Sequence, residues 1–201
     1  MPITKISLNN FRCFKNLELS LSPGINFFFG SNGSGKTSIL ESVFIFSSGK
    51  SFKSSNLTSL INYDNDKFTL KGFDNKKGYI VEIEKSKNKT ISISLNNNKT
   101  NTSKLVKEFP CTPIHNNTFS FADASPDFRR KLVDRSIFIA DDNFSKVWFS
   151  FYRSLRQRNF LLKNNRISDI YSWNTKLADD AEKLTKYRKD FFEKTLNEFY
   201  L

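Results

Sequence analysis

Eight consecutive residues near the N-terminus have the types and spacing of a loop that binds nucleotide phosphates. They fit the pattern G-x-x-x-x-G-K-[ST] and are Gly30, Ser31, Asn32, Gly33, Ser34, Gly35, Lys36 and Thr37. Glycines allow backbone N–H groups to curl around a phosphate without Cβ clashes. The lysine supplies a cation for the β- and γ-phosphates, and the threonine hydroxyl is a ligand for Mg²⁺. The pattern therefore predicts a site for ATP and Mg²⁺.

A loop of this kind has to be held between a strand and a helix. Residues 25–29 form an almost wholly apolar run, which is typical of a strand covered on both faces. Residues 38–46 place apolar side chains on one face of a helix, whose N-terminus would add a partial positive charge behind the loop. Both neighbours that the loop requires are thus predicted.

The rest of the first half is rich in strand patterns and turns. All seven glycines lie in the first 78 residues, and residues 22–24 and 96–98 read as turns. Short runs that are apolar or alternate between apolar and polar residues predict five strands, at residues 3–8, 17–21, 68–72, 78–84 and 90–95. Residues 111–114 are a further candidate strand.

The second half has a helical pattern after Pro126 and contains no glycine. Phe128, Leu132 and Val133 share one face of a first helix, and long helices are predicted at about residues 144–162 and 172–201. The expected inward side chains are Val147, Trp148, Phe151, Leu155 and Leu162 on the former helix, and Trp173, Leu177, Ala181, Leu184, Arg188 and Phe191 on the latter. Antiparallel packing of the two helices is one expectation.

The predicted fold class is α/β. A P-loop NTPase head with a β-rich subdomain is expected in residues 1–115, and an α-helical lobe in residues 116–201.

The formal net charge of +12 favours a polyanionic partner such as nucleic acid. A/T-rich codons also enrich Lys, Asn and Phe, so arginine is the more telling residue. Arg12 is the only arginine before residue 111. Arg153, Arg156 and Arg158 are candidate DNA phosphate ligands, and a solvated helix face explains them equally well.

Several classes of protein are disfavoured by the composition. His115 is the only histidine, which argues against a His-based metal site or hydrolase triad. No apolar run is long enough to span a membrane, and no secretion signal is recognised. Cys13 and Cys111 show no metal spacing and are expected to be free thiols in a reducing cytoplasm.

Flanking motifs add a resemblance to a known family. Asn9-Asn10-Phe11-Arg12 before the loop resembles the SMC-like branch of the ABC ATPases. Further stretches, in the same order along the chain, resemble the RecF family; they are Leu21-Ser22-Pro23-Gly24-Ile25-Asn26-Phe27, Gly49-Lys50-Ser51-Phe52-Lys53-Ser54, Ser125-Pro126-Asp127-Phe128-Arg129-Arg130-Lys131-Leu132-Val133-Asp134 and Arg156-Gln157-Arg158-Asn159.

The resemblance implies DNA repair and replication functions. RecF proteins bind ATP, dimerise around two nucleotides and bind single-stranded, gapped or junction DNA. They act with RecO and RecR to load RecA, and they support the SOS response. The resemblance also implies that Arg12 contacts the nucleotide phosphates, whereas Lys53 approaches the nucleotide or DNA.

The sequence also departs from the family pattern. No glycine follows Gly78, so no signature loop is expected, and the C-terminal part of the ATPase core is predicted to be missing. Residues 137–142 imitate a Walker B strand, but the preferred interpretation is a helix end whose acids start the next helix. Thr112 and residues 116–117 stand where the family carries Gln and Pro-Glu. Almost no ATP turnover is therefore expected.

Some alternatives stay open at this stage. Another SMC-like ATPase head would use the helices as the base of a coiled-coil arm. A small-molecule P-loop kinase is a weaker alternative, because a kinase would alternate strands and helices. Arg129 and Arg130 are expected to pair with Asp123, Asp127 or Asp134.

Overall fold

The computed structural model describes residues 3–114, 125–166, 168 and 170–199. The chain divides into two compact units, which we call the sheet unit (residues 1–115) and the helical unit (residues 116–201). None of the described helices combines the length and the apolar character that a transmembrane span requires.

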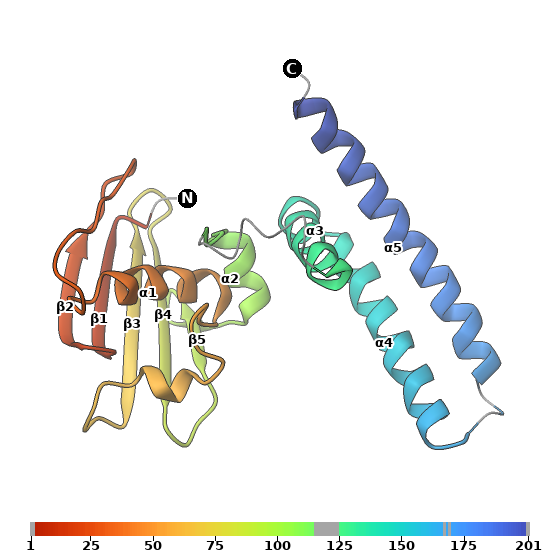
Figure 1. Ribbon diagram of the computed structural model, residues 1–201, viewed down its shortest axis with the longest axis horizontal. Helices are drawn as coiled ribbons and strands as arrows, with labels where there is room; N and C mark the ends of the chain where they lie inside the picture. Colours follow the sequence, from red (N-terminus) through yellow and green to blue (C-terminus); the bar gives the residue numbers. More distant parts are fainter. Residues whose placement is uncertain (1–2, 115–124, 167, 169, 200–201) are drawn as a thin grey trace. The chain divides into compact units, whose positions relative to one another are not determined.

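The sheet unit is built on one sheet of six strands, and each pair of neighbours is antiparallel (Figure 1). In spatial order the strands are β2 (Phe14–Ser20), β1 (Lys5–Phe11), β3 (Lys67–Asp74), β4 (Tyr79–Ser86), β5 (Ser92–Leu95) and β6 (Asn98–Lys99). Asn96 and Asn97 have positive φ values of 50° and 63°, so the predicted turn at this point is confirmed as the connection between β5 and β6.

One face of the sheet carries the core. Alternate side chains of the strands point to this face and are almost fully buried, as in Leu8, Phe68 and Ile83. Helix α1 (Lys36–Ser48) lies across it, with Phe46 completely buried. Gly72 makes room for the helix, because an added Cβ would stand 3.0 Å from a Val81 methyl carbon and 3.4 Å from the Phe46 ring. The core thus fixes the helix that follows the loop.

The opposite face of the sheet is polar and carries cross-strand ion pairs. They are Lys5–Glu18 at 2.7 Å, Lys67–Glu84 at 2.8 Å and Lys71–Glu82 at 3.6 Å. The glutamates of neighbouring strands therefore partly neutralise the lysine charge on this face, which is typical of a solvated face.

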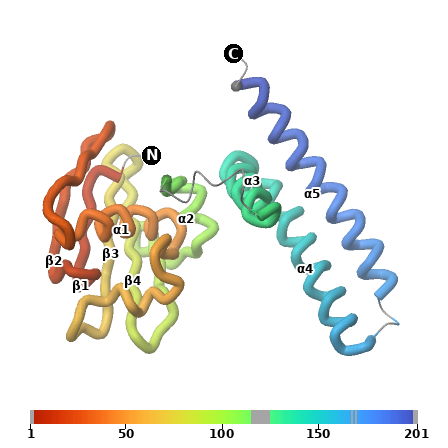
Figure 2. The backbone as a smooth tube through the Cα atoms, viewed as in Figure 1, coloured from red at the N-terminus to blue at the C-terminus, as the bar shows by residue number. Residues whose placement is uncertain are grey.

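The prediction of a buried strand at residues 25–29 is wrong. The segment is in no strand, and Ile25, Phe27 and Phe29 are 78%, 82% and 92% exposed. It belongs to the long connection between β2 and α1 (Figure 2). An extended segment becomes a strand only by pairing with a neighbour, and no strand of the described residues pairs with it.

Two other details of the sheet unit differ from the prediction. Residues 111–114 form no strand, and a helix that was not predicted, α2 (Thr102–Glu108), precedes them. The Asn101 side chain caps α2 by accepting the Lys104 N–H at 3.0 Å. A short 3₁₀-helix, η1 (Leu57–Leu60), follows α1.

The helical unit contains α3 (Pro126–Ala140), α4 (Phe144–Lys163) and α5 (Ile170–Phe199). Helices α4 and α5 lie side by side (Figure 1). Contacts join Phe144 to Tyr187, Ser154 to Asp180 and Arg158 to Asn174, so the pair is antiparallel, as expected.

The core of the helical unit confirms most of the predicted inward side chains and corrects three of them. Leu184 is buried, and further predicted side chains pack against the core; they are Val133, Val147, Trp148, Phe151 and Phe191. On α3, Phe128 and Leu132 are 50% and 38% exposed, whereas Asp134 and Ile137 are buried. On α4, Leu162 is 44% exposed and Leu161 is buried. Asp134 is an inward position of α3 that hydrophobicity alone did not identify.

Candidate nucleotide-binding site

The glycine loop adopts backbone conformations that favour glycine. Gly30, Gly33 and Gly35 have φ values of 147°, 85° and 94°. Gly35 is also the N-cap of α1, and an added Cβ there would stand 2.3 Å from Cζ of Phe14. The loop therefore meets the N-terminus of a buried helix, where backbone N–H groups favour anions.

The Lys36 ammonium lies against the loop that precedes it. Its Nζ donates to the carbonyl oxygens of Gly30 and Ser31, both at 2.8 Å. The contacts hold the lysine at the start of α1 while the loop residues around it remain exposed. A cation is thus fixed at the position where the motif requires one.

A cavity of about 400 Å³ opens beside the loop. Its lining brings together the predicted residues Arg12, Lys36, Thr37 and Lys53 with further loop positions; the full lining is Arg12, Cys13, Asn32, Gly33, Gly35, Lys36, Thr37, Ser38 and Lys53. Three of these side chains are cationic and none is a carboxylate. Such a lining favours a polyanion of small size, as a nucleotide triphosphate is.

Arg12 is held in place by both its backbone and its side chain. Its φ is 55°, its N–H donates to the Leu60 carbonyl at 2.7 Å, and its own carbonyl accepts from the Asn62 side chain at 2.6 Å. Its guanidinium forms a two-point ion pair with Glu41, at 2.9 Å for each hydrogen bond. Arg12 is therefore not a solvated arginine at a strand end.

Glu41 is the site residue that sequence reasoning missed. It lies on α1 and is 1% exposed. The sequence did indicate that Glu41 needs a partner, because a carboxylate within the apolar stretch of a helix requires a nearby cation. Arg12 is the only arginine before residue 111 and was the natural candidate.

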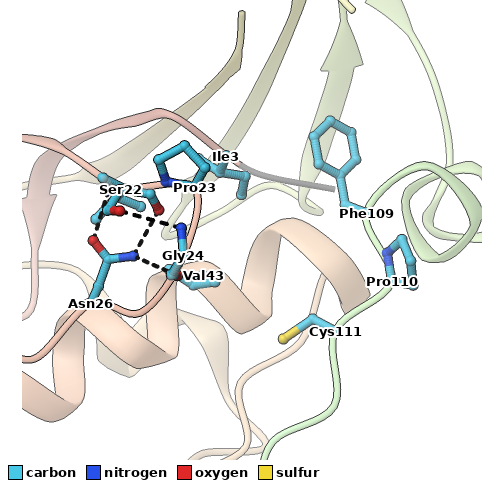
Figure 3. Close-up of a pocket in the computed structure, with 10 residues that line it drawn as sticks. Ile3, Ser22, Pro23, Gly24, Asn26, Val43, Phe109, Pro110 and Cys111 are labelled. Carbon is cyan, nitrogen blue, oxygen red and sulfur yellow. Dashed lines mark hydrogen bonds between the residues drawn. The ribbon is translucent and has the colours of Figure 1, made fainter. Parts of the chain in front are cut away.

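A second cavity in the sheet unit has a different character (Figure 3). It measures about 290 Å³ and is lined on one side by the turn at residues 22–26 and on the other by Phe109, Pro110 and Cys111. The Asn26 side chain closes the turn, accepting from the Ser22 N–H at 2.8 Å and donating to the Ser22 carbonyl at 2.9 Å. No charged side chain lines this cavity, so phosphates favour the first one.

The candidate DNA ligands lie on α4 of the helical unit. Arg153 and Arg156 are exposed, and neither pairs with a carboxylate in the part of the chain that the structure describes. Arg158 is half-buried, and its Nε donates to the Asn174 side chain of α5 at 2.8 Å. Arg158 thus joins α4 to α5, unlike Arg153 and Arg156.

Two of the three expected partners of Arg129 and Arg130 form ion pairs with other residues, although the charge of Arg130 also acts on Asp127. Asp134 pairs with Arg188, and Asp127 forms its ion pair with Lys131 at 2.6 Å. The Lys131 hydrogen bond lowers the pKa of Asp127. Asp123, His115 and residues 116–117 lie outside the described residues.

The stretch that imitates Walker B is a helix end, as predicted, but its acids precede α4 and do not start it, since the N-cap of α4 is Asn143. Helix α3 ends at Ala140, and Asp141 turns the chain by accepting the Asn143 N–H at 2.7 Å. Within the described residues, no group of three or more His, Cys, Asp or Glu side chains is placed to hold a metal ion. The Thr37 hydroxyl, in the lining of the cavity beside the loop, is the group that the motif offers to a Mg²⁺ ion.

Comparisons with known proteins agree with this geometry. A protein-family profile described as an AAA domain matches residues 5–198. The DNA replication and repair protein RecF of Aliivibrio fischeri (strain MJ11) is 33% identical over 196 residues, covering 95% of this chain and 55% of that protein. A solved structure of the recombination mediator protein RecF, described as RecF-ATPrS in the RecFOR pathway, matches with a TM-score of 0.82 and 26% identity, covering 95% of this chain and 54% of that chain.

An SMC head shares the fold less closely. Its TM-score is 0.53 at 20% identity, over 76% of this chain and 57% of that chain. The sheet, the helix across it and the glycine loop at the start of that helix define a P-loop ATPase head of the type found in RecF and SMC proteins. The chain belongs to the AAA-domain family and, within it, to the RecF family. It spans about half the length of the curated relatives that it matches.

Proposed function

We propose that the sheet unit binds ATP with Mg²⁺ and serves as the nucleotide-binding part of a RecF-type DNA replication and repair protein. The observation that carries the proposal is the cavity beside the glycine loop, where Arg12, Lys36 and Lys53 meet without a carboxylate in the lining. Lys36 binds the β- and γ-phosphates, and the Thr37 hydroxyl coordinates the Mg²⁺ ion. The ion supplies charge neutralisation for the phosphates when it is bound.

The experiment is an ATP titration of three proteins in the presence of Mg²⁺. Lys36→Ala removes a cation from the phosphate site and is expected to weaken binding by at least ~2 kcal/mol, which is about thirtyfold. Lys50→Ala is the control, because Lys50 is an exposed lysine that does not line the cavity. Equal titration curves for wild type and Lys36→Ala would contradict the proposal.

The proposal extends to DNA through family resemblance. The protein binds single-stranded, gapped or junction DNA in the cytoplasm, dimerises with ATP when the rest of the ATPase core is present, and acts with RecO and RecR in RecA loading and the SOS response. The net charge of +12 and the naming of the relatives as DNA replication and repair proteins support this extension. A comparison of gapped with intact duplex DNA at one salt concentration tests it, and equal affinities would contradict the preference for gaps.

A further inference from the structure

Glu41 is a buried carboxylate whose hydrogen-bond partners come from two other segments around the nucleotide cavity. It stands one helical turn after Thr37 on α1 and is 1% exposed. Its Oε2 accepts from Nε of Arg12, and its Oε1 accepts from Nη2 of Arg12, each at 2.9 Å. Its Oε1 also accepts from the Ser51 hydroxyl. Since a buried carboxylate needs such donors, the contacts hold both segments against α1.

The Ser51 contact reaches a second cation of the cavity. The Oγ of Ser51 accepts the N–H of Lys53 and the N–H of Ser54, both at 2.9 Å. Ser51 therefore fixes the turn that carries Lys53, while its own hydroxyl hydrogen is committed to Glu41. Through one carboxylate, the cations of two segments are tied to the helix that begins with Lys36.

Arg12 keeps donors for a ligand after this pairing. A guanidinium has five N–H donors, and Glu41 takes two of them, which leaves three. A two-point pair with a carboxylate also fixes the plane of the guanidinium. An arginine that is already ordered loses less conformational entropy when it binds a phosphate. The pair thus prepares Arg12, which lines the cavity, for an anion.

We propose that Glu41 is the positioning residue of the nucleotide site, holding Arg12 and the Lys53 turn in the geometry that binds a nucleoside triphosphate. The proposal rests on the proposed function, because it assigns Glu41 a role at the same site. Glu41 itself does not contact the nucleotide. It acts through Arg12 and Ser51, so the part of its effect on affinity that passes through Arg12 must disappear when Arg12 is already gone.

A double-mutant cycle on the 201-residue chain tests this dependence. Glu41→Gln keeps the shape of the side chain but offers an N–H₂ group where Arg12 or Ser51 needs an acceptor. In an ATP titration with Mg²⁺, Glu41→Gln and Arg12→Ala are each expected to weaken binding about tenfold, which is ~1.4 kcal/mol. The double variant is expected to bind less than a hundredfold more weakly than the wild type, because part of the effect of Glu41 passes through Arg12.

Two results of this cycle would overturn the proposal. One is an affinity of Glu41→Gln equal to that of the wild type, and the other is a double variant about a hundredfold weaker, as independent effects would give. Glu84→Gln is the matched control, since Glu84 pairs with Lys67 on the opposite face of the sheet. If Glu41→Gln lowers the thermal midpoint too far for titration, Ser51→Ala replaces it. Weaker ATP binding by Ser51→Ala supports the proposal, and wild-type binding overturns it.

Lys36→Ala, measured alongside, separates the two proposals. If Lys36→Ala loses ATP binding and Glu41→Gln does not, the nucleotide site stands and the role of Glu41 is wrong. If Lys36→Ala binds like the wild type, the nucleotide site itself is wrong, and the role of Glu41 is overturned with it.

Discussion

Asp134 and Arg188 lie 54 residues apart in the chain and form a two-point ion pair, at 2.7 and 2.8 Å, that fastens α3 to α5. The Trp148 indole N–H of α4 donates to the same carboxylate at 3.1 Å, so one aspartate joins all three helices. The hydrogen bond to Asp134 raises the pKa of Arg188 above its ordinary value. Asp134 is 5% exposed, and such a group persists only when its charge is paired.

Removal of Asp134 is predicted to destabilise the helical unit. Asp134→Ala leaves Arg188 and the Trp148 indole without their acceptor. The free energy of unfolding is expected to fall by about 3 kcal/mol. This is the lower end of the range for a broken buried ion pair, because Arg188 is partly exposed. Urea unfolding followed by tryptophan fluorescence measures it, because Trp148 and Trp173, the two tryptophans, both lie in this unit. Asp127→Ala, which breaks only the exposed pair on the same helix, should leave the midpoint almost unchanged. Equal midpoints for the two variants would contradict the prediction.

A second buried aspartate makes the α4–α5 pair sensitive to acid. Asp180 is 4% exposed and accepts from the Ser150 hydroxyl at 2.9 Å and from the Ser154 hydroxyl at 2.8 Å. Burial opposes its ionisation, but the hydrogen bonds of Ser154 and Ser150, together with Lys176, lower its pKa below the ordinary value. A lowered carboxyl pKa contributes stability above the pKa of the unfolded chain, and that stability is lost as the pH falls through the folded value.

The predicted loss therefore begins as the pH falls below about 4, the ordinary range for Asp. Asp180→Asn cannot titrate, so its unfolding midpoint should change less between pH 5 and pH 2–3 than that of the wild type. Urea titrations at several pH values measure this difference. Parallel pH profiles for the two proteins would show that Asp180 does not contribute to the acid sensitivity.

The sequence predicted the sheet unit better than it predicted the loop's surroundings. Strand β3 buries one side chain in two, and that alternation is visible in the sequence. Residues 25–29 carry an equally strong apolar signal, yet Phe29 is 92% exposed. Hydrophobicity records that a segment prefers burial, but a strand also needs a partner backbone, which a local pattern does not reveal.

The candidate site was predictable where one motif defines it. Lys36 and Thr37 follow from spacing alone, since the loop and the start of α1 are local structure. Glu41 and Ser51 are joined to Arg12 by contacts between distant segments, and such pairings cannot be deduced from periodicity. On α3, Val133 packs against the core as predicted, but the buried position Asp134 was missed for a related reason, because its burial depends on its pairing with Arg188 of α5.

Two glycines of the loop are predicted to respond differently to alanine. Gly33 and Gly35 have similar positive φ values, 85° and 94°, so each alanine carries backbone strain of about 1–3 kcal/mol. Open space surrounds Gly33, whereas a Cβ at Gly35 would also collide with Phe14. Gly35→Ala should therefore lower the thermal midpoint of the sheet unit more than Gly33→Ala does, as measured by circular dichroism. A larger loss for Gly33→Ala would contradict the assigned loop geometry.

Almost no ATP turnover is predicted for the 201-residue chain. Hydrolysis needs an acidic group to hold Mg²⁺ and a residue to orient the attacking water. Asp141 and Asp142 follow the end of α3, and Asp141 forms a local turn with Asn143. A phosphate-release assay at saturating ATP checks the prediction. Measurable turnover that Asp142→Asn abolishes would instead assign these acids a Walker B role.

DNA binding is predicted to be weak, sensitive to salt and independent of sequence, with Arg153 and Arg156 as its main contacts in the helical unit. Both side chains are exposed and lie one turn apart on α4, so they can follow a phosphate backbone. Arg158 is half-buried and donates to Asn174, so it has fewer free donors. Several lysines of the sheet unit are paired with glutamates and contribute less free charge.

The test is a fluorescence-anisotropy titration of DNA at several salt concentrations. Each lost phosphate contact reduces the slope of log affinity against log salt by about 0.9 on duplex DNA, so Arg153→Ala/Arg156→Ala should reduce it by about 1.8. Arg158→Ala is the control on the same helix and should reduce the slope by much less. Affinities should be micromolar or weaker and should fall uniformly across sequences, since phosphate contacts carry no base information. If the double variant keeps the wild-type slope, the phosphates are bound elsewhere, and the assignment to α4 is wrong.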